Sequence, residues 1–229
     1  LIGPDGGTLY RLPTYADSLS TQVNDALISL QPDGSAKIEV KQSSHLFQYE
    51  DKADIINIEP ARQKDWLRSD ISLVQAKVDN IRFKETKQKE PQLDIHYTIE
   101  SRQYGNKTGK RLFIPVNIFH KGFYSPSNQG ERTQDVQINY GYLDIDSLNI
   151  RLPEGYKIES LPKTTDMETK FGKFHSSITL EEGGNILIVH RLLFHQGNYP
   201  KEDNTDFMDF RKNVATQYAA KIIVKKSGE

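Results

Sequence analysis

Histidine and aspartate are the residues through which this chain could carry out chemistry, because its 229 residues include no cysteine. Without cysteine there is no thiolate nucleophile, no thiolate metal ligand and no disulfide. His190 and His195 fall in one expected strand, and His175 falls in the strand before it across a turn. Alternate side chains point to opposite faces of a strand, so His175 and His190 should not meet. We therefore predict no metal site and expect His190 to be buried and hydrogen-bonded.

Asp144 and Asp146 are two residues apart, which places both carboxylates on one face of a strand. Such a pair suits general acid–base catalysis or cation binding. The segment 144–149 lacks the glycine turn of a calcium loop, however, and the chain contains no Gly-x-Ser-x-Gly elbow for a serine nucleophile. We therefore expect a solvent-exposed strand face here, and we predict neither a catalytic residue nor a cofactor site.

An aromatic cluster is the candidate contact site for a partner or ligand, and it consists of Phe119, His120, Phe123 and Tyr124. Exposed aromatic side chains flanked by polar residues stack on sugars or anchor a protein partner. Folded under a neighbouring module, the same side chains are interior packing, which is the interpretation we favour. A convergent group of histidines and aspartates in a pocket would instead indicate an independent hydrolase.

The composition is that of a globular protein without special electrostatic character. Lys and Arg (30) nearly cancel Asp and Glu (31), which leaves a formal net charge of −1. Nucleic-acid binders usually show a basic excess, so we expect no nucleic-acid partner. No apolar run approaches the roughly 18 residues that span a bilayer, and no transmembrane segment is predicted. The chain starts at Leu1 without Met or a signal pattern, so we expect its targeting segment upstream.

Polar and apolar residues alternate with the period of a half-buried strand in several segments. The clearest segments are 36–41, 93–100 and 135–140, and turn residues lie between such runs at 32–34, 105–109, 171–173 and 182–184. Short turns between strands indicate antiparallel pairing. We predict a mainly β fold of antiparallel β-sandwich-like modules.

Two helices are expected within this β structure. The first covers 57–69, with Pro60 in its first turn and Trp66, the single tryptophan, in its interior. The second covers 204–219, where an apolar stripe should close the C-terminal module, and a strand follows at 222–224. The stripe consists of Phe207, Phe210, Val214 and Tyr218. Small and polar residues cluster between 117 and 133, so we predict modules at 1–125 and 126–229.

The second half of the chain resembles a known family. Residues 152–162, Leu-Pro-Glu-Gly-Tyr-Lys-Ile-Glu-Ser-Leu-Pro, are similar to the LPxGYxxExLP signature that follows the core of Bacteroidetes transglutaminase-like proteins. Further similarities are the FG hairpin at Phe171-Gly172, the strand with His190-Arg191, the helix start at Tyr199-Pro200, Phe207 and Phe210, and the last strand at 222–226. Residues 1–13 and 27–35 resemble the strand and hairpin after the core. Arg132 resembles an entry strand, although the usual proline is replaced.

This resemblance implies a place within a larger protein. Such proteins combine a DUF3857 domain, a papain-like core carrying Cys, His and Asp, and a C-terminal DUF3858 region, and this chain is similar to the last part alone. The resemblance implies a non-catalytic accessory region of an exported, periplasmic protein, whose partner is the core of the same parent chain. On excision, an apolar patch is expected near 1–12 and 119–124. The alternative is a carbohydrate- or peptide-binding β-sandwich module.

Overall fold

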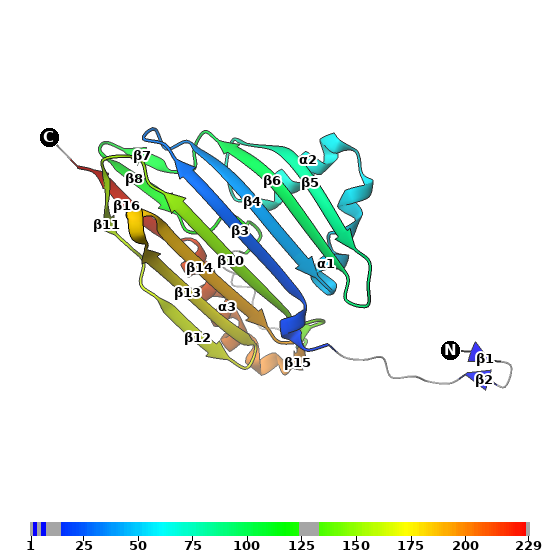
Figure 1. Cartoon of the computed structure of the whole chain (residues 1–229). Coiled ribbons are helices and arrows are strands. Elements are labelled where there is room, and N and C mark those ends of the chain that lie inside the picture. The colour runs from blue at the N-terminus through cyan, green and yellow to red at the C-terminus, as the bar shows by residue number, and fades with distance from the viewer. Residues whose placement is uncertain (1, 4–5, 8–14, 124–132, 228–229) are drawn as a thin grey trace.

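A computed structural model describes residues 2–3, 6–7, 15–123 and 133–227 of the chain. It places 49 % of residues in strands, and half of these strands form one eight-stranded sheet. The strands of that sheet are β3 (Thr21–Leu30), β4 (Ala36–His45), β5 (Ala76–Thr86), β6 (Gln92–Ser101), β10 (Tyr142–Arg151), β12 (Thr165–Thr169), β13 (Gly172–Leu180) and β14 (Ile186–Phe194). They lie in the order β12-β13-β14-β10-β3-β4-β6-β5 (Figure 1).

A second, four-stranded sheet has the order β11-β16-β8-β7. Its strands are β7 (Asn106–Thr108), β8 (Arg111–Pro115), β11 (Tyr156–Ser160) and β16 (Lys221–Lys226). Two short pairs complete the β structure: β1 (Ile2–Gly3) with β2 (Gly6–Gly7), and β9 (Val136–Ile138) with β15 (Gly197–Tyr199). The predicted mainly β class is confirmed.

Three α-helices and four short 3-10 turns connect the strands. The helices are α1 (Phe47–Glu50), α2 (Pro60–Asp70) and α3 (Asn204–Tyr218), and the turns are η1 (Asp17–Leu19), η2 (Ala53–Asn57), η3 (Glu182–Gly184) and η4 (Lys201–Asp203). Both predicted helices are present as α2 and α3, whereas the single turn of α1 was not predicted. No helix among the described residues is long and apolar enough to cross a membrane.

The turns predicted at 32–34, 171–173 and 182–184 join neighbouring antiparallel strands, whereas the segment 105–109 contains strand β7. The turn between β3 and β4 requires glycine. Gly34 has a φ of +93°, and a Cβ there would lie 2.2 Å from the carbonyl oxygen of Gly105. A left-handed conformation and this close approach together favour glycine. The turn fixes the register of β3 against β4, which pairs Ile28 with Ile38.

One pairing in the large sheet is parallel. β10 lies beside β3 with Asp146 opposite Asn24, while all other neighbouring strands of this sheet are antiparallel. The parallel pair joins strands from the first and second halves of the chain into one sheet. The division predicted at residue 125 therefore does not coincide with a division between sheets, and most of the predicted junction (124–132) lies outside the described residues.

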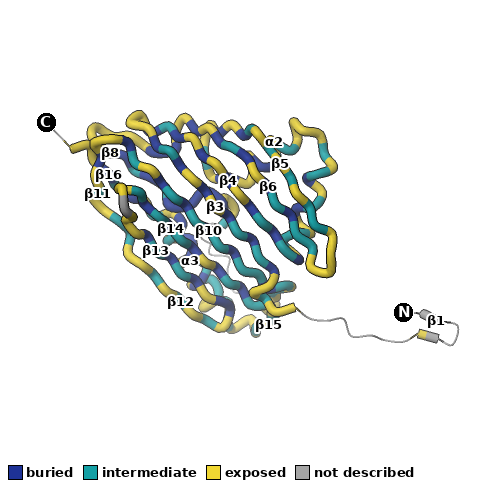
Figure 2. Tube along the Cα trace, viewed as in Figure 1, coloured by how far each residue is buried: buried dark blue, intermediate teal, exposed yellow. Residues whose placement is uncertain are grey.

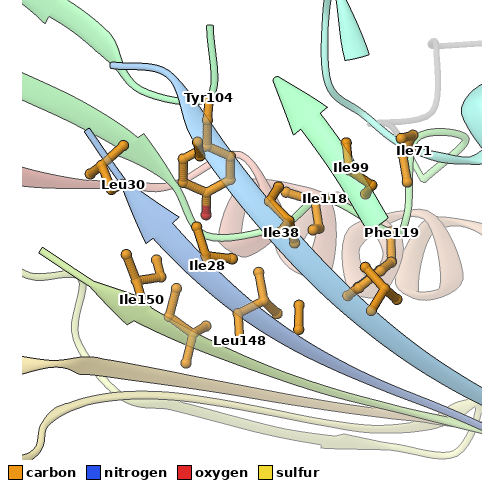
Figure 3. Close-up of a cluster of buried hydrophobic side chains, with 14 of the residues drawn as sticks. Ile28, Leu30, Ile38, Ile71, Ile99, Tyr104, Ile118, Phe119, Leu148 and Ile150 are labelled. Atoms are coloured by element: carbon orange, nitrogen blue, oxygen red, sulfur yellow. The ribbon is translucent and has the colours of Figure 1, made fainter. Parts of the chain in front are cut away.

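The inward face of the large sheet, which packs on the four-stranded sheet and the helices, carries two apolar clusters. The aliphatic core lies against the four-stranded sheet, as in a sandwich, and part of it is shown in Figure 3. Its fully buried members include Ile28, Ile38, Ile99, Leu148, Ile150 and Ile186 from the large sheet and Leu112, Ile114, Ile222 and Val224 from the small one.

The aromatic core lies at the other end of this face, under α3, which passes behind β13 and β14 in Figure 1. It contains Phe171, Phe174, Leu192, Phe194, Phe210, Val214 and Tyr218. The apolar stripe predicted on the last helix is confirmed, because Phe210, Val214 and Tyr218 are buried and Phe207 is half-buried. Figure 2 shows buried residues concentrated in the central strands and exposed residues at the loops and edges.

Candidate functional site

Between the two cores, the inward face of the sheet carries two transverse rows of polar side chains. Cross-strand pairing aligns Ser44, Gln22 and Asp144 in one row, and Gln42, Asn24, Asp146 and His190 in the next. We call these residues the polar belt. All of them are buried, and Asn24 and Ser44 have no exposed surface. Burial of so many polar groups lowers the stability of the fold unless they are hydrogen-bonded.

A chain of hydrogen bonds crosses the belt. The Gln42 side-chain amide donates to Asn24 Oδ1 (2.7 Å), and Asn24 Nδ2 donates to Asp146 Oδ1 (2.7 Å). The other carboxylate oxygen of Asp146 accepts a 2.6 Å hydrogen bond from His120 Nε2. His190 donates from Nε2 to the carbonyl oxygen of Val116 (2.9 Å). The centre of the belt is therefore a buried ion pair held by amide side chains.

His120 reaches the belt from the loop after β8. Asn117 Oδ1 accepts hydrogen bonds from the backbone N–H groups of Phe119 (3.0 Å) and His120 (3.2 Å), which fixes this loop. The ring of Tyr218 stacks on the imidazole with 4.8 Å between centroids. The His120 side chain is only 10 % exposed. Loop and helix together hold the imidazole against Asp146.

The ionisation of the three central groups follows from these contacts. Burial acts to lower the pKa of His120, but the charge and hydrogen bond of Asp146 outweigh it and raise the pKa to about 9. Burial acts to raise the pKa of Asp146, but the charge and hydrogen bond of His120 lower it overall. Asp144 has less compensation, and burial raises its pKa to about 7. At neutral pH, His120 and Asp146 form an ion pair beside a carboxyl group that is partly protonated.

A pocket of about 430 Å³ opens beside Asp144 and His120. Its aromatic lining comprises Trp66, Phe119, Phe123, Tyr140 and Tyr142, and its polar lining includes Gln22, Gln48, Asp51, Lys52, Asp70 and Lys121. The lining residues come from strands β3 and β10, from helices α1 and α2 and from the loops around them, so the pocket exists only in the assembled fold. Its volume is in the range of sites for small molecules.

Lys52 and Gln48 connect the pocket to the belt. Lys52 is buried, and its ammonium donates a hydrogen bond to Gln22 Oε1 and lies 3.9 Å from Asp70 Oδ2. Burial lowers the pKa of Lys52, although Asp70 and Asp144 oppose this effect. Gln48 Nε2 donates to Asp144 Oδ1 (2.9 Å). The other oxygen of Asp144 lies 3.9 Å from His120 Nδ1, which is beyond hydrogen-bonding distance.

This arrangement suits binding better than nucleophilic catalysis. A histidine base must be neutral and must contact a hydroxyl or thiol that it deprotonates. His120 is instead held as a cation by Asp146, and its second nitrogen faces a carboxylate. Within the described parts of the chain, no group of three or more His, Cys, Asp or Glu residues is placed to hold a metal ion.

The predicted exposure of Asp144 and Asp146 is wrong, because these side chains are 7 % and 1 % exposed. The outward positions of β10 are taken by Leu143 and Ile145, and the carboxylates find partners in Gln48, Asn24 and His120. The predictions for the strand histidines are confirmed. His190 is buried and hydrogen-bonded, whereas His175 pairs with Asp166 at 2.7 Å on the outward face.

The aromatic cluster predicted as a contact site is divided by the structure. Phe119 is 5 % exposed and belongs to the aliphatic core, as the favoured interpretation expected. His120 and Phe123 line the pocket, and Tyr124 lies outside the described residues. His120 with the two aspartates is the convergent cluster that was named as the sign of a hydrolase, but its ion pairing favours binding.

Several residues of the site were not predicted from the sequence. Lys52 and Trp66 have no local pattern that marks them as pocket residues. The polar belt does have a local pattern. Ala26, Ile28 and Leu30 face inward, and the same alternation, followed towards the N-terminus, places Asn24 and Gln22 on that buried face. Polar residues at the inward-facing positions of a strand therefore indicated the site in the sequence.

The outward face of the large sheet provides a second candidate surface. Its three central strands, β14, β10 and β3, carry a band of apolar side chains, whereas β4 beside them carries Lys37, Glu39 and Lys41. The apolar band consists of Val23, Leu27, Leu143, Ile145, Leu187, Val189 and Leu193. Leu27 is 42 % exposed and, with Leu187, borders a hollow of about 350 Å³.

Comparison with family models identifies the protein family of this chain. A family model for DUF3858, described as a domain of unknown function with a solved structure, matches residues 110–224, half of the chain. The chain belongs to the DUF3858 family. The matched segment begins before β8, upstream of the boundary predicted at residue 126, and β8 pairs with β16 at the far end of the same segment. The DUF3858 segment thus includes His120, Asp144 and Asp146, while Gln22, Asn24 and Lys52 precede it.

The DUF3858 chain also resembles a crystal structure described as that of a "putative protease" from Parabacteroides distasonis. The TM-score is 0.38 and the sequences are 6 % identical, over 91 % of this chain and 100 % of that chain. No curated protein matches the sequence.

Proposed function

We propose that this chain is a non-catalytic accessory region of a larger exported, transglutaminase-like protein, and that it packs against the transglutaminase-like core of the same parent. Membership of the DUF3858 family supports this proposal, as does the resemblance of residues 152–162 and 222–226 to the segment that follows such a core. Acyl transfer of the papain type needs a cysteine thiolate, and the chain has no cysteine. The resemblance to such proteins is also the basis on which we propose a role in interaction and a periplasmic location.

The apolar band on the outward face of the large sheet is the observation that carries this proposal. An antiparallel sheet with one face in water normally alternates apolar residues inward with polar residues outward. β4 and β6 follow that rule, but Leu143 lies opposite Leu193 and Ile145 lies beside Val23 on the outward face of the neighbouring strands. Apolar side chains gathered on an outward face are typical of a protein–protein interface, and here Ser147, Asn149 and Arg191 lie among them.

The test is association with the separately produced core of the parent protein, measured by titration calorimetry. We expect Leu27→Ser combined with Leu187→Ser to weaken association at least about tenfold, because both side chains border the same hollow. Lys37→Ser, on the outward face of β4, is the matched control and should leave affinity unchanged. Absence of association, or an unchanged affinity in the double variant, would refute docking through this face.

The pocket beside the polar belt favours a second function, the binding of a carbohydrate or peptide. It combines aromatic walls with polar groups that have spare hydrogen-bonding capacity, which is typical of small-molecule sites. The pocket opens from the inward face and the apolar band lies on the outward face. The two functions are therefore compatible and can be tested by separate variants.

A further inference from the structure

The hydrogen bonds within the pocket leave specific atoms available to a ligand. His120 donates from Nε2 to Asp146, so Nδ1 of the imidazolium remains a donor. Asp144 accepts from Gln48 at Oδ1, so Oδ2 remains an acceptor. Nδ1 and Oδ2 are 3.9 Å apart, which is too long for a hydrogen bond between them. One oxygen atom placed between the two can complete both.

The atom that fits between them must accept from His120 and donate to Asp144. A hydroxyl group does both through a single oxygen, whereas an amide N–H only donates and an amide carbonyl only accepts. Lys52 is a further donor, because its ammonium carries three N–H groups and contacts Gln22. The polar floor therefore matches adjacent hydroxyl groups better than a peptide backbone.

The charges around the pocket argue against an ionic ligand. Three acidic residues, Asp51, Asp70 and Asp144, line the pocket together with three cations, Lys52, Lys121 and protonated His120. The aspartates repel a ligand carboxylate and the cations repel a ligand ammonium, so the attraction of either ligand is offset by a repulsion. A neutral ligand avoids both penalties.

The walls suit a ring with an apolar face. Trp66, Phe123, Tyr140 and Tyr142 are half-buried, so part of each ring borders the pocket. Aromatic side chains with one exposed face pack against flat, partly apolar ligands. The Lys52 ammonium lies 5.9 Å from the Trp66 ring centroid, which brings the polar floor next to this wall.

We propose that the pocket binds a neutral sugar, one hydroxyl of which bridges His120 and Asp144 while the sugar ring packs against the aromatic wall. This inference deepens the second function proposed above and does not depend on docking through the apolar band. Trp66 is the only tryptophan of the chain, so its fluorescence reports directly on occupancy of the pocket.

The experiment titrates the intact chain with glucose, galactose, mannose, N-acetylglucosamine and their β-linked disaccharides, with glucuronate, glucosamine and a neutral tripeptide as comparisons. We expect saturable changes in Trp66 fluorescence with at least one neutral sugar. Asp144→Asn should weaken that sugar at least about tenfold, because the anionic acceptor is lost. Asp25→Asn, the same substitution at an exposed position of β3, should have no effect.

Two further measurements keep the test decisive. If Asp144→Asn melts far below the wild type, Tyr140→Ala on the half-buried wall replaces it, and calorimetry should show the same loss of affinity. The proposal is overturned if no neutral sugar changes the fluorescence. It is also overturned if glucuronate, glucosamine or the tripeptide binds better, or if binding survives both substitutions.

Discussion

The aliphatic core and the polar belt lie side by side on one face of one sheet, yet they are built from opposite chemistry. On this face Ile28 pairs with Ile150 and Ala26 pairs with Leu148. Two residues further along the same strands, Asn24 pairs with Asp146. Each buried aliphatic side chain contributes about 1.5–3 kcal/mol through removal from water. A buried ion pair gains little net stability, because desolvation offsets the attraction.

This difference indicates what each region does. The aliphatic rows and the small sheet account for the stability of the fold. The belt adds buried charges that apolar residues of similar size would replace without loss, so stability alone does not account for it. The pocket opens beside Asp144 of the belt. We therefore propose that the two inward apolar cores serve folding and that the belt serves recognition.

The largest expected effect comes from the apolar regions. Phe210→Ala should lower the free energy of unfolding by about 3–5 kcal/mol, because a buried ring is replaced by a cavity under α3. Urea denaturation measures the change. Asp209→Ala, an exposed neighbour on the same helix, is the control and should cost under about 1 kcal/mol. Equal losses in the two variants would contradict the docking of α3.

Breaking the ion pair in the belt should lower the free energy of unfolding slightly less than Phe210→Ala does, and the effects of its two partners should be strongly coupled. Asp146→Ala leaves the His120 cation buried without its partner and should cost about 3 kcal/mol. Removing both Asp146 and His120 should lower the free energy of unfolding by less than the sum of the two single losses, with a coupling energy of about 1–3 kcal/mol. A double-mutant cycle by denaturation measures this value. Strict additivity would mean that the two side chains do not form the ion pair.

The belt should also make stability depend on pH. The pKa of His120 is raised to about 9 in the folded protein, against about 6.5 in an unfolded chain. Its stabilising effect is therefore complete below pH 6.5 and is lost as the pH rises through 9. We expect the wild type to lose about 2–3 kcal/mol between pH 6.5 and 9, as measured by denaturation at each pH. In His120→Gln most of this slope should disappear, which leaves the smaller contribution of Asp144, whose pKa is raised to about 7. A slope as steep as that of the wild type would assign the titration to another group.

The smallest effect is expected on the outward face. Leu27→Ala should change the free energy of unfolding by less than about 0.5 kcal/mol, because the side chain is 42 % exposed. Ile28→Ala, the next residue of the same strand, removes a fully buried side chain and should cost about 2–5 kcal/mol. Thermal melting distinguishes the two. A loss for Leu27→Ala close to that of Ile28→Ala would show that the outward band serves folding rather than association.

Local patterns predicted the elements of the fold but misplaced the carboxylates. The alternation of 36–41 and 93–100 led directly to β4 and β6, and the stripe on 204–219 led to α3. β10 was ambiguous, because both of its faces contain apolar residues: Leu148 and Ile150 on one, Leu143 and Ile145 on the other. Only the partners across the sheet decide which face turns inward, and those partners are distant in sequence.

The sequence by itself determined the β class, the turns, the last helix and the absence of cysteine chemistry, because each depends on residue type and on spacing within a few positions. The tertiary structure alone decided the parallel pairing of β3 with β10, since no local pattern specifies a partner strand more than 110 residues away. That pairing aligns Asn24 with Asp146, and the loop after β8 then brings His120 to the same point. A buried charge is tolerated only where such partners meet, so the site exists because of contacts that the chain forms on folding.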